Sequence, residues 1–304
     1  GKFDYDRIVA VGGGAVMDMS KVVAVAGGAS IDDVIDHLPD FKRSVRLVLV
    51  PTTCGTGSEV TEIAAINRTR LGCKAGIAGP EMFADDAVLV PELLYGLPDH
   101  VFATSSLDAL VHSVESTLSP NSTPYTRMFG YEAMKMIISG YKAVAEAGPA
   151  GSPERRVKRN ELMRDFLIAS DYAGISFDTG GCAAVHALSY QLGGKYHVPH
   201  GESNYAMFTG VLRNYMEIKP EGEILKMNQF IADILGCDVA DVYDALETLI
   251  NKLLPKKALH EYGVTEQDLP EFADRVIKTQ ERLMKNCFVP LDYDRVLKIF
   301  KELY

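Results

Sequence analysis

The first third of the chain alternates short apolar runs with segments rich in glycine and threonine. Residues 7–11 form a short apolar run that ends in three glycines, and residues 15–26 then carry apolar side chains at helical spacing. A continuous apolar run of this length is typical of a parallel strand buried on both faces, so the segment indicates a strand, a turn and a helix. Further strands are predicted at 45–50, 63–66, 76–78 and 87–90.

The pattern changes after residue 97, where strand signals stop and helical spacing takes over. Clusters of proline and glycine at 119–124, 148–153 and 193–194 should end the helices before them, because proline lacks a backbone donor and glycine favours helix ends. We predict an α/β nucleotide-binding domain over 1–97 and an all-helical domain over 98–304, with a binding cleft between them. The expected helices are 102–117, 125–146, 154–175, 180–192, 200–215, 222–235, 239–254, 268–285 and 293–303.

Length, composition and charge limit the class of protein. A chain of 304 residues, 47% of them hydrophobic, can bury a sizeable core. The net charge of −10 argues against a nucleic-acid partner, because phosphates require a basic surface, and we expect no membrane-spanning segment. Five scattered cysteines without a CxxC pair favour reduced thiols in the cytoplasm. Because the glycine-rich turn comes so close to the first residue, we expect further strands to precede it.

A glycine-rich turn joins the first predicted strand to the first helix. Gly12, Gly13 and Gly14 let the backbone approach a pyrophosphate closely, and the amide groups at the helix start favour negative charge. The segment differs from the common GxGxxG pattern, because Met17 stands at the third glycine position. A tight turn that binds no ligand is the alternative for this element alone.

The second strand leads into the hydroxyl-rich loop Pro51–Glu59. The hydroxyl groups of Thr52, Thr53, Thr56 and Ser58 can donate hydrogen bonds to phosphate or ribose oxygens. An ordinary loop in which Thr56 or Ser58 caps the next helix is the alternative. Both loops follow the carboxyl ends of strands, where open α/β sheets bind ligands, so a bound dinucleotide is the favoured interpretation.

One carboxylate and three imidazoles stand at spacings that suit a single metal ion. Asp108 and His112 lie four residues apart in an apolar helical run, so one helical face presents both side chains. His186 lies before a predicted helix end and His200 begins the next helix, so the loop between them can bring both imidazoles to the same ion. Oxygen and nitrogen donors without cysteine favour Fe²⁺ or Zn²⁺. For each histidine alone, a core side chain with satisfied hydrogen bonds is the alternative.

These motifs resemble those of the iron-dependent (group III) alcohol dehydrogenase family. Residues 12–21 are similar to its GGGSxxDxAK element and residues 51–61 to its second nucleotide loop. Residues 108–115 are similar to its first metal-ligand element, and His186 together with residues 199–204 to its second. The resemblance covers essentially the whole chain and implies a dehydroquinate-synthase-like fold, in which an α/β nucleotide-binding part precedes an all-helical part. The metal ligands that it implies are Asp108, His112, His186 and His200.

The resemblance also implies a cofactor site and a branch of the family. Within the family, the motifs are most similar to those of the branch that interconverts 4-hydroxybutyrate and succinate semialdehyde with NAD. NADP stays open, because the family segment that reads the ribose 2′-hydroxyl would precede this chain. The predicted cofactor contacts, with Thr56 added from the loop pattern, are Gly13, Gly14, Asp18, Thr52, Thr53, Thr56 and Lys74.

Proton transfer and substrate binding are less directly marked in the sequence. Many family members carry a histidine four residues after the third metal ligand, where this chain has Tyr190. Tyr190 and His197 are therefore the candidates for proton transfer. Lys195 is a candidate for holding a substrate carboxylate, with a solvated loop lysine as the alternative. The resemblance further implies a small alcohol or aldehyde substrate and a homodimer or larger homo-oligomer.

The predicted reaction is hydride transfer from a primary alcohol to NAD, with a metal ion stabilising the alkoxide. Other functions stay open on the sequence alone. The same scaffold supports dehydrogenases of the 1,3-propanediol, butanol or glycerol type, and a carbon–oxygen lyase of the dehydroquinate synthase kind. The lyase would need a basic cluster for a phosphorylated substrate, and none stands near the candidate ligands. A metal-bound structural relative without turnover is a third alternative.

Overall fold

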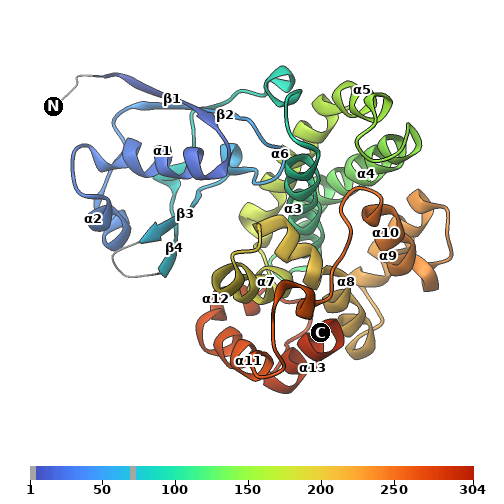
Figure 1. Cartoon of the computed structure of the whole chain (residues 1–304). Coiled ribbons are helices and arrows are strands. Elements are labelled where there is room, and N and C mark those ends of the chain that lie inside the picture. The colour runs from blue at the N-terminus through green and yellow to red at the C-terminus, as the bar shows by residue number, and fades with distance from the viewer. Residues whose placement is uncertain (1–4, 69–72) are drawn as a thin grey trace.

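The strands form a parallel sheet and a separate antiparallel pair, both next to the first helix (Figure 1). The computed structural model describes residues 5–68 and 73–304, and the side chains of residues 5–66 and 76–304. Helix α1 contacts β1, β2 and β3, so it lies between the two sheets. The parallel sheet has the order β1-β2-β5, and β3 pairs with β4. The bounds are β1 Arg7–Gly12, α1 Gly14–Ala26, β2 Arg46–Pro51, β3 Ile63–Arg68, β4 Cys73–Ala78 and β5 Asp86–Ala87.

The unit of strand, glycine turn, helix and parallel strand that the first apolar runs predict is confirmed, since β1 and β2 pair along their whole lengths. Strands predicted at 63–66 and 76–78 are present and longer. The strand predicted at 87–90 is shorter than expected. After the Val88 N–H binds a carbonyl of β2, the chain leaves the sheet for the 3-10 helix Pro91–Leu94, because proline cannot donate to a strand ladder.

One short helix is not predicted by the apolar pattern. Helix α2 (Ile31–Asp36) begins after Ser30, whose hydroxyl accepts a hydrogen bond from the Asp33 backbone N–H at 3.1 Å. A six-residue helix has too few apolar positions to show helical periodicity, so only its N-cap marks it in the sequence.

Beyond β5 the described chain is helical, as the sequence predicts, and the helices lie together on one side of the strand-containing part (Figure 1). The α-helices are α3 Asp99–Leu118, α4 Pro124–Glu146, α5 Pro153–Glu161, α6 Met163–Gly180, α7 Ala184–Tyr196, α8 His200–Ile218, α9 Glu223–Leu235, α10 Val242–Asn251, α11 Asp268–Thr279, α12 Glu281–Met284 and α13 Tyr293–Leu303. Short 3-10 helices are η1 Leu38–Asp40, η2 Ser58–Val60, η4 Pro80–Met82, η5 Pro91–Leu94, η6 Val239–Asp241 and η7 Leu259–Tyr262.

Two predicted helices are each divided in the structure. The pattern over 154–175 forms α5 and α6, because the chain breaks at Leu162. The pattern over 268–285 forms α11 and α12 with a break at Gln280. In both cases the apolar spacing continues across the break, so the hydrophobic pattern alone does not show it.

The helix predicted over 180–192 is wrong at both ends. It begins at Ala184, because Gly181 has a φ of 76° that a right-handed helix does not allow. It continues through Gly193 and Gly194, which helices tolerate at a cost of about 1 kcal/mol each. It ends at Tyr196, and the next residue, His197, has a φ of 56° and a backbone N–H that binds the Gly193 carbonyl at 3.1 Å.

Helix α3 is the centre of the helical part and is buried along most of its length. It packs against α4, α6, α7 and α8. Its buried residues include Asp108, His112 and Glu115. Buried polar and charged groups are costly unless they are paired. Helix α3 therefore carries a set of polar side chains into the core, where they must bind one another or a ligand.

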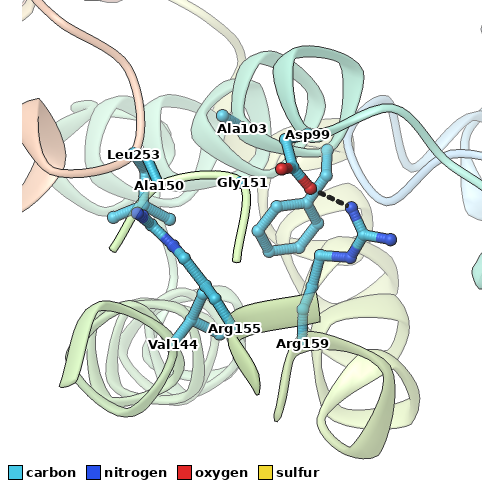
Figure 2. A pocket seen from close by; sticks show the side chains of 9 residues that line it. Asp99, Ala103, Val144, Ala150, Gly151, Arg155, Arg159 and Leu253 are labelled. Atoms are coloured by element: carbon cyan, nitrogen blue, oxygen red, sulfur yellow. Dashed lines mark hydrogen bonds and ion pairs between the residues drawn. The ribbon is translucent and has the colours of Figure 1, made fainter. Parts of the chain in front are cut away.

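A buried arginine ties α5 to the start of α3. Arg159 is 2% exposed, and its guanidinium group donates to Asp99 Oδ1 at 2.7 Å and to the Leu97 carbonyl at 2.9 Å. Figure 2 shows Asp99 and Arg159 beside a small hollow that Arg155 also lines. Arg155 donates to the Lys252 carbonyl at 2.6 Å. Because both guanidinium groups bind protein acceptors, we assign them a structural role in joining these helices.

The change from strands to helices falls between β5 and α3, close to the predicted boundary at residues 97 and 98. Cys54 and Leu94 nevertheless pack in the same buried cluster as the helices. The division of the chain into domains 1–97 and 98–304 therefore stays a prediction. Over residues 5–68 and 73–304, every helix is too short or too polar to cross a lipid bilayer.

Candidate metal and nucleotide site

Three imidazoles meet one carboxylate oxygen in the core of the helical part. The Nε2 atoms of His112, His186 and His200 lie 3.8, 3.5 and 3.4 Å from Asp108 Oδ1. The donor atoms of Asp108, His186 and His200 all lie within 4.8 Å of one another. The four residues that the sequence predicts as ligands are therefore brought together, and their ligation of a metal stays a prediction.

Three helices position these side chains. Asp108 and His112 are one turn apart on α3, so both face the same point. His186 lies in the first turn of α7, and His200 is the first residue of α8. Gly201 lets α8 approach α3 closely, because a Cβ atom built there would lie 1.9 Å from the Thr104 carbonyl oxygen.

The far ring nitrogens of two of the histidines are held by protein acceptors. His186 Nδ1 lies 2.6 Å from Glu115 Oε2, and His112 Nδ1 lies 3.2 Å from the Gly55 carbonyl oxygen. Glu115 also accepts hydrogen bonds from the backbone N–H groups of Ala183 and Val185 at 2.9 and 2.6 Å. Such contacts fix the orientation of an imidazole and direct its Nε2 atom toward the centre, as in known metal sites. This geometry fits a metal-binding role.

The Asn204 side chain lies among the same atoms. Its Nδ2 donates to Asp108 Oδ1 at 2.8 Å and lies 3.3 Å from His186 Nε2 and 3.4 Å from His200 Nε2. Its Oδ1 is buried without a hydrogen-bond partner. A buried amide oxygen left unpaired is unusual and costs free energy. The Asn204 Oδ1 atom is thus an acceptor in the site, and a further hydrogen-bond donor or a cation would complete its bonding.

The charges around the centre favour a cation. Burial alone would raise the pKa of Asp108, but His112 and His200 hold this pKa well below its ordinary value. Burial alone would lower the pKa of His186, but Cys182, Asp108 and Glu115 raise it well above its ordinary value. Burial also opposes the charged form of Cys182, yet the two neighbouring imidazoles lower the pKa of this thiol to about 7. Positive charge is stabilised here, whether it is carried by protons or by a metal ion.

One side of the centre is open to solvent. The His200 side chain is 41% exposed, whereas Asp108, His112 and His186 are buried. The Tyr190 ring lies 5.9 Å from the His200 ring, and burial raises the pKa of Tyr190. Tyr190 is therefore near the ligands, and its role in proton transfer stays a prediction.

The other two candidates from this region lie on the surface. His197 is exposed at the end of α7, and its role in proton transfer stays a prediction. Lys195 Nζ donates to Asp268 Oδ1 and lies 3.5 Å from Glu271 Oε2. Lys195 is therefore neither in a loop nor simply solvated: it lies in α7 and is paired with α11, and its contact with a substrate carboxylate stays a prediction.

The two predicted nucleotide loops touch each other. A Cβ atom built at Gly13 would lie 3.6 Å from the Thr53 side chain, and one built at Gly14 would lie 2.7 Å from Thr56 Cγ2. Thr56 can lie this close to α1 because residue 14 is a glycine and has no Cβ atom. The N-cap residue of η2 is Gly57 rather than Thr56 or Ser58, but the Thr56 hydroxyl accepts a hydrogen bond from the Ser58 backbone N–H at 3.3 Å. Thr56 therefore does bind the start of this short helix, and its contact with a cofactor stays a prediction.

Asp18 joins the second loop to β3. Its Oδ1 accepts a hydrogen bond from the Ser58 hydroxyl at 2.6 Å, and its Oδ2 accepts one from the Ala65 backbone N–H at 2.9 Å. The Thr52 N–H donates to the Gly12 carbonyl at 3.0 Å and so fixes the start of the second loop. Asp18 thus has a clear structural role, and its contact with a cofactor stays a prediction.

The remaining predicted cofactor contact, Lys74, lies on β4 but outside the residues whose side chains the structure describes.

The nucleotide loops and the imidazole cluster are in direct contact. Gly55, in the second loop, accepts from His112 Nδ1, and Thr56, the next residue, packs against Gly14. A ligand bound over the glycine turn would therefore lie next to the loop that orients His112. A site for hydride transfer requires such an arrangement, because the reacting groups must be held close together.

Three residues of the site are not predicted from the sequence. Glu115 lies three positions after His112, and Asn204 lies four positions after His200, so helical spacing could have placed both on the ligand faces. Cys182 lies in the loop before α7, where no periodicity applies. Its position near the imidazoles is visible only in the structure.

Comparison with known proteins defines the family. Residues 1–91 match the model of the iron-containing alcohol dehydrogenases, and residues 102–304 match that of the C-terminal part of the Fe-containing alcohol dehydrogenase family. The chain belongs to the iron-containing alcohol dehydrogenase family. It is 44% identical over 304 residues to the 4-hydroxybutyrate dehydrogenase of Clostridium kluyveri. The matched region covers 100% of this chain and 80% of that protein.

Solved structures agree with this assignment. The sulfoacetaldehyde reductase of Bifidobacterium kashiwanohense, in complex with NAD⁺, matches with a TM-score of 0.83 and 26% identity over 98% of this chain and 76% of its own. An iron-containing alcohol dehydrogenase from Thermococcus thioreducens matches with a TM-score of 0.84 and 24% identity over 99% of this chain and 78% of its own. The predicted fold class is confirmed, with an N-terminal α/β part that contains a parallel sheet and a helical C-terminal part.

Proposed function

We propose that this protein is a metal- and NAD-dependent dehydrogenase that interconverts 4-hydroxybutyrate and succinate semialdehyde. The similarity to the Clostridium kluyveri enzyme over the whole chain supports this substrate. The observation that carries the proposal is the convergence of three Nε2 atoms within 3.4–3.8 Å of Asp108 Oδ1, beside a loop that touches the glycine turn.

The proposed metal ligands are Asp108, His112, His186 and His200. Imidazole and carboxylate donors suit Fe²⁺, and the same donors also suit Zn²⁺. A divalent ion held there would stabilise the alkoxide form of the alcohol as a Lewis acid, and the nicotinamide would accept the hydride.

The residues of the chain prepare the site for this chemistry. Glu115 and the Gly55 carbonyl hold two imidazoles in orientation, which lowers the cost of arranging the ligands. Because His200 is the exposed ligand, the substrate enters from its side. Tyr190 lies beside His200 and is the proposed group for passing the alcohol proton to solvent, with His197 as the second candidate.

The proposed NAD contacts come from the two touching loops. The glycine turn offers the amide groups at the start of α1 to the pyrophosphate, because the first amides of a helix have no acceptor within it. The predicted set comprises Gly13, Gly14, Asp18, Thr52, Thr53, Thr56 and Lys74.

The experiment that tests this function compares substrates and metals. We expect Fe²⁺-loaded protein to reduce NAD⁺ with 4-hydroxybutyrate and to do so much more slowly with 1,3-propanediol, butanol or glycerol. The variant His200→Ala should lose Fe²⁺ and activity together. Faster turnover of 1,3-propanediol would instead identify a propanediol-type enzyme, and metal binding without NADH binding or turnover would indicate a structural relative. Full turnover by metal-free His200→Ala protein would refute the mechanism.

We also propose that the protein acts as a homo-oligomer in the cytoplasm. The cytoplasmic location is supported by the cysteines, since Cys54, Cys182, Cys237 and Cys287 are free in the described part of the chain. The oligomer is supported by the resemblance to the family. Light scattering on purified protein measures the oligomeric mass directly, and a monomer would refute that part.

A further inference from the structure

A thiol lies against two of the proposed ligands. The donor atoms of His112, Cys182 and His186 all lie within 4.8 Å of one another. This second group shares His186 with the group formed by Asp108, His186 and His200. A metal centre built on these helices therefore has a sulfur donor at its edge as well as oxygen and nitrogen donors.

The backbone around Cys182 is fixed by specific contacts. The peptide group that follows Cys182 is bound at both ends: Asn286 Nδ2 donates to the Cys182 carbonyl at 2.9 Å, and the Ala183 N–H donates to Glu115 at 2.9 Å. Before Cys182, the Gly181 N–H donates to the Phe177 carbonyl at 2.7 Å. Because the backbone is held on either side of the residue, the thiol stays beside the imidazoles without rearrangement of the chain.

Ring contacts hold the two histidines in place beside the thiol. The rings of His112 and His186 stack 4.7 Å apart with an interplanar angle of 15°, and Phe177 stacks on His112 at 4.3 Å. One nitrogen of each imidazole lies within 4.8 Å of the Cys182 sulfur and of the other nitrogen. The three donor groups are therefore close together in a fixed arrangement.

We propose that His112, Cys182 and His186 form an alternative binding set for a soft divalent cation, such as Cd²⁺ or Zn²⁺, that competes with the ion held through Asp108 and His200. Thiolate ligands select soft metals, whereas the carboxylate suits harder ions such as Fe²⁺. The proton of the thiol is released to solvent when the sulfur binds the ion. The inference rests on the proposed metal centre and concerns which metals that centre accepts.

The consequence is a centre whose metal identity depends on Cys182. Two ions cannot share His186, so a soft ion bound to the thiol excludes a second ion from the Asp108 position. Removing the sulfur should weaken Cd²⁺ and Zn²⁺ binding and leave Fe²⁺ binding nearly unchanged.

The test measures cadmium–thiolate bonding directly in metal-free full-length protein. Titration with Cd²⁺ should produce the ultraviolet sulfur-to-cadmium charge-transfer band in the wild type. The band should be absent in Cys182→Ala and Cys182→Ser, and chelator competition should show Cd²⁺ affinity lower by about tenfold or more. Cys237→Ala is the matched control and should keep both the band and the affinity. His200→Ala should keep the band, because His200 belongs only to the Asp108 group.

The outcomes separate this inference from the proposed function. If the wild type binds Cd²⁺ without the band, or if Cys182→Ala keeps the band and the affinity, the thiol is not a ligand and the inference is overturned while the metal centre stands. If folded wild-type protein binds none of Fe²⁺, Zn²⁺ or Cd²⁺, the centre itself is refuted. Circular dichroism verifies that each variant is folded. If Cys182→Ala does not fold, Cys182→Ser is used for the comparison instead.

Discussion

Replacing Gly201 by alanine should open the proposed metal centre by driving two helices apart. The added Cβ atom would lie 1.9 Å from the Thr104 carbonyl oxygen, 2.7 Å from its carbonyl carbon and 3.1 Å from its Cα atom. These neighbours are backbone atoms of α3, so no side chain can rotate away to make room.

The size of the shift follows from these distances. Since Cβ atoms do not approach closer than 3.0 Å, the contact must lengthen by at least 3.0 − 1.9 = 1.1 Å. His200 is the adjacent residue and moves with α8, so its 3.4 Å separation from Asp108 should increase by a similar distance. Metal sites tolerate errors of only about 0.2 Å in ligand distance, so we expect metal affinity to fall on the order of 10- to 100-fold.

The stability of the protein should change much less than its metal affinity. Overpacking costs about 1–3 kcal/mol, and alanine returns about 1 kcal/mol because it favours a helix more than glycine does. The assays are chelator competition for metal affinity and thermal unfolding of the metal-free protein. Gly194→Ala is the matched control, since Gly194 lies on α7 with nothing within 4 Å of its added Cβ atom. Wild-type metal affinity in Gly201→Ala would refute the claim that this close contact sets the ligand geometry.

Three other substitutions test the support around the site. Glu115→Gln should lower metal affinity by about 10- to 100-fold, because it removes the carboxylate that orients His186; unchanged affinity in a chelator competition would contradict this role. Ser58→Ala removes the hydroxyl that binds Asp18 and should weaken NADH binding by roughly tenfold, as measured by fluorescence titration. Glu59 is 3% exposed with both carboxylate oxygens unpaired, and burial raises its pKa from 4.5 to about 7. The folded state therefore binds more protons than the unfolded state between these values, so the free energy of unfolding should fall by about 3 kcal/mol as pH rises through this window. In Glu59→Gln that loss should be absent from pH-dependent denaturant curves, and an unaltered pH profile would show that Glu59 is not its source.

Periodicity predicted most of the fold because its strands and helices are long enough to show it. The unit of β1, α1 and β2 is confirmed, and so is the series of helices after residue 97. The sequence fails where the backbone departs from its pattern for reasons that lie far along the chain. Helix α7 begins late because of the Gly181 conformation and because Glu115 on α3 binds the N–H groups at its start.

The four side chains that meet in the candidate site could be identified from the sequence, whereas their surroundings could not. Asp108 and His112 could be paired from their spacing within one helix. His186 and His200 come from separate helices, so the loop between them allowed a shared ion, and the family resemblance assigned both residues to it. The roles of Asn204 and Cys182 depend on how α3, α7 and α8 pack, and no local pattern specifies that packing.

The ligands of the proposed centre come from three helices, and this makes the metal a cross-link as well as a reactive group. An ion that binds only the assembled set stabilises the native chain by mass action, by about 2.7 kcal/mol at a concentration 100 times its dissociation constant. His200 is the exposed member, so unfolding and metal release should begin together at the first turn of α8. Iron supply would then set the lifetime of the folded protein against proteolysis, in addition to its catalytic rate.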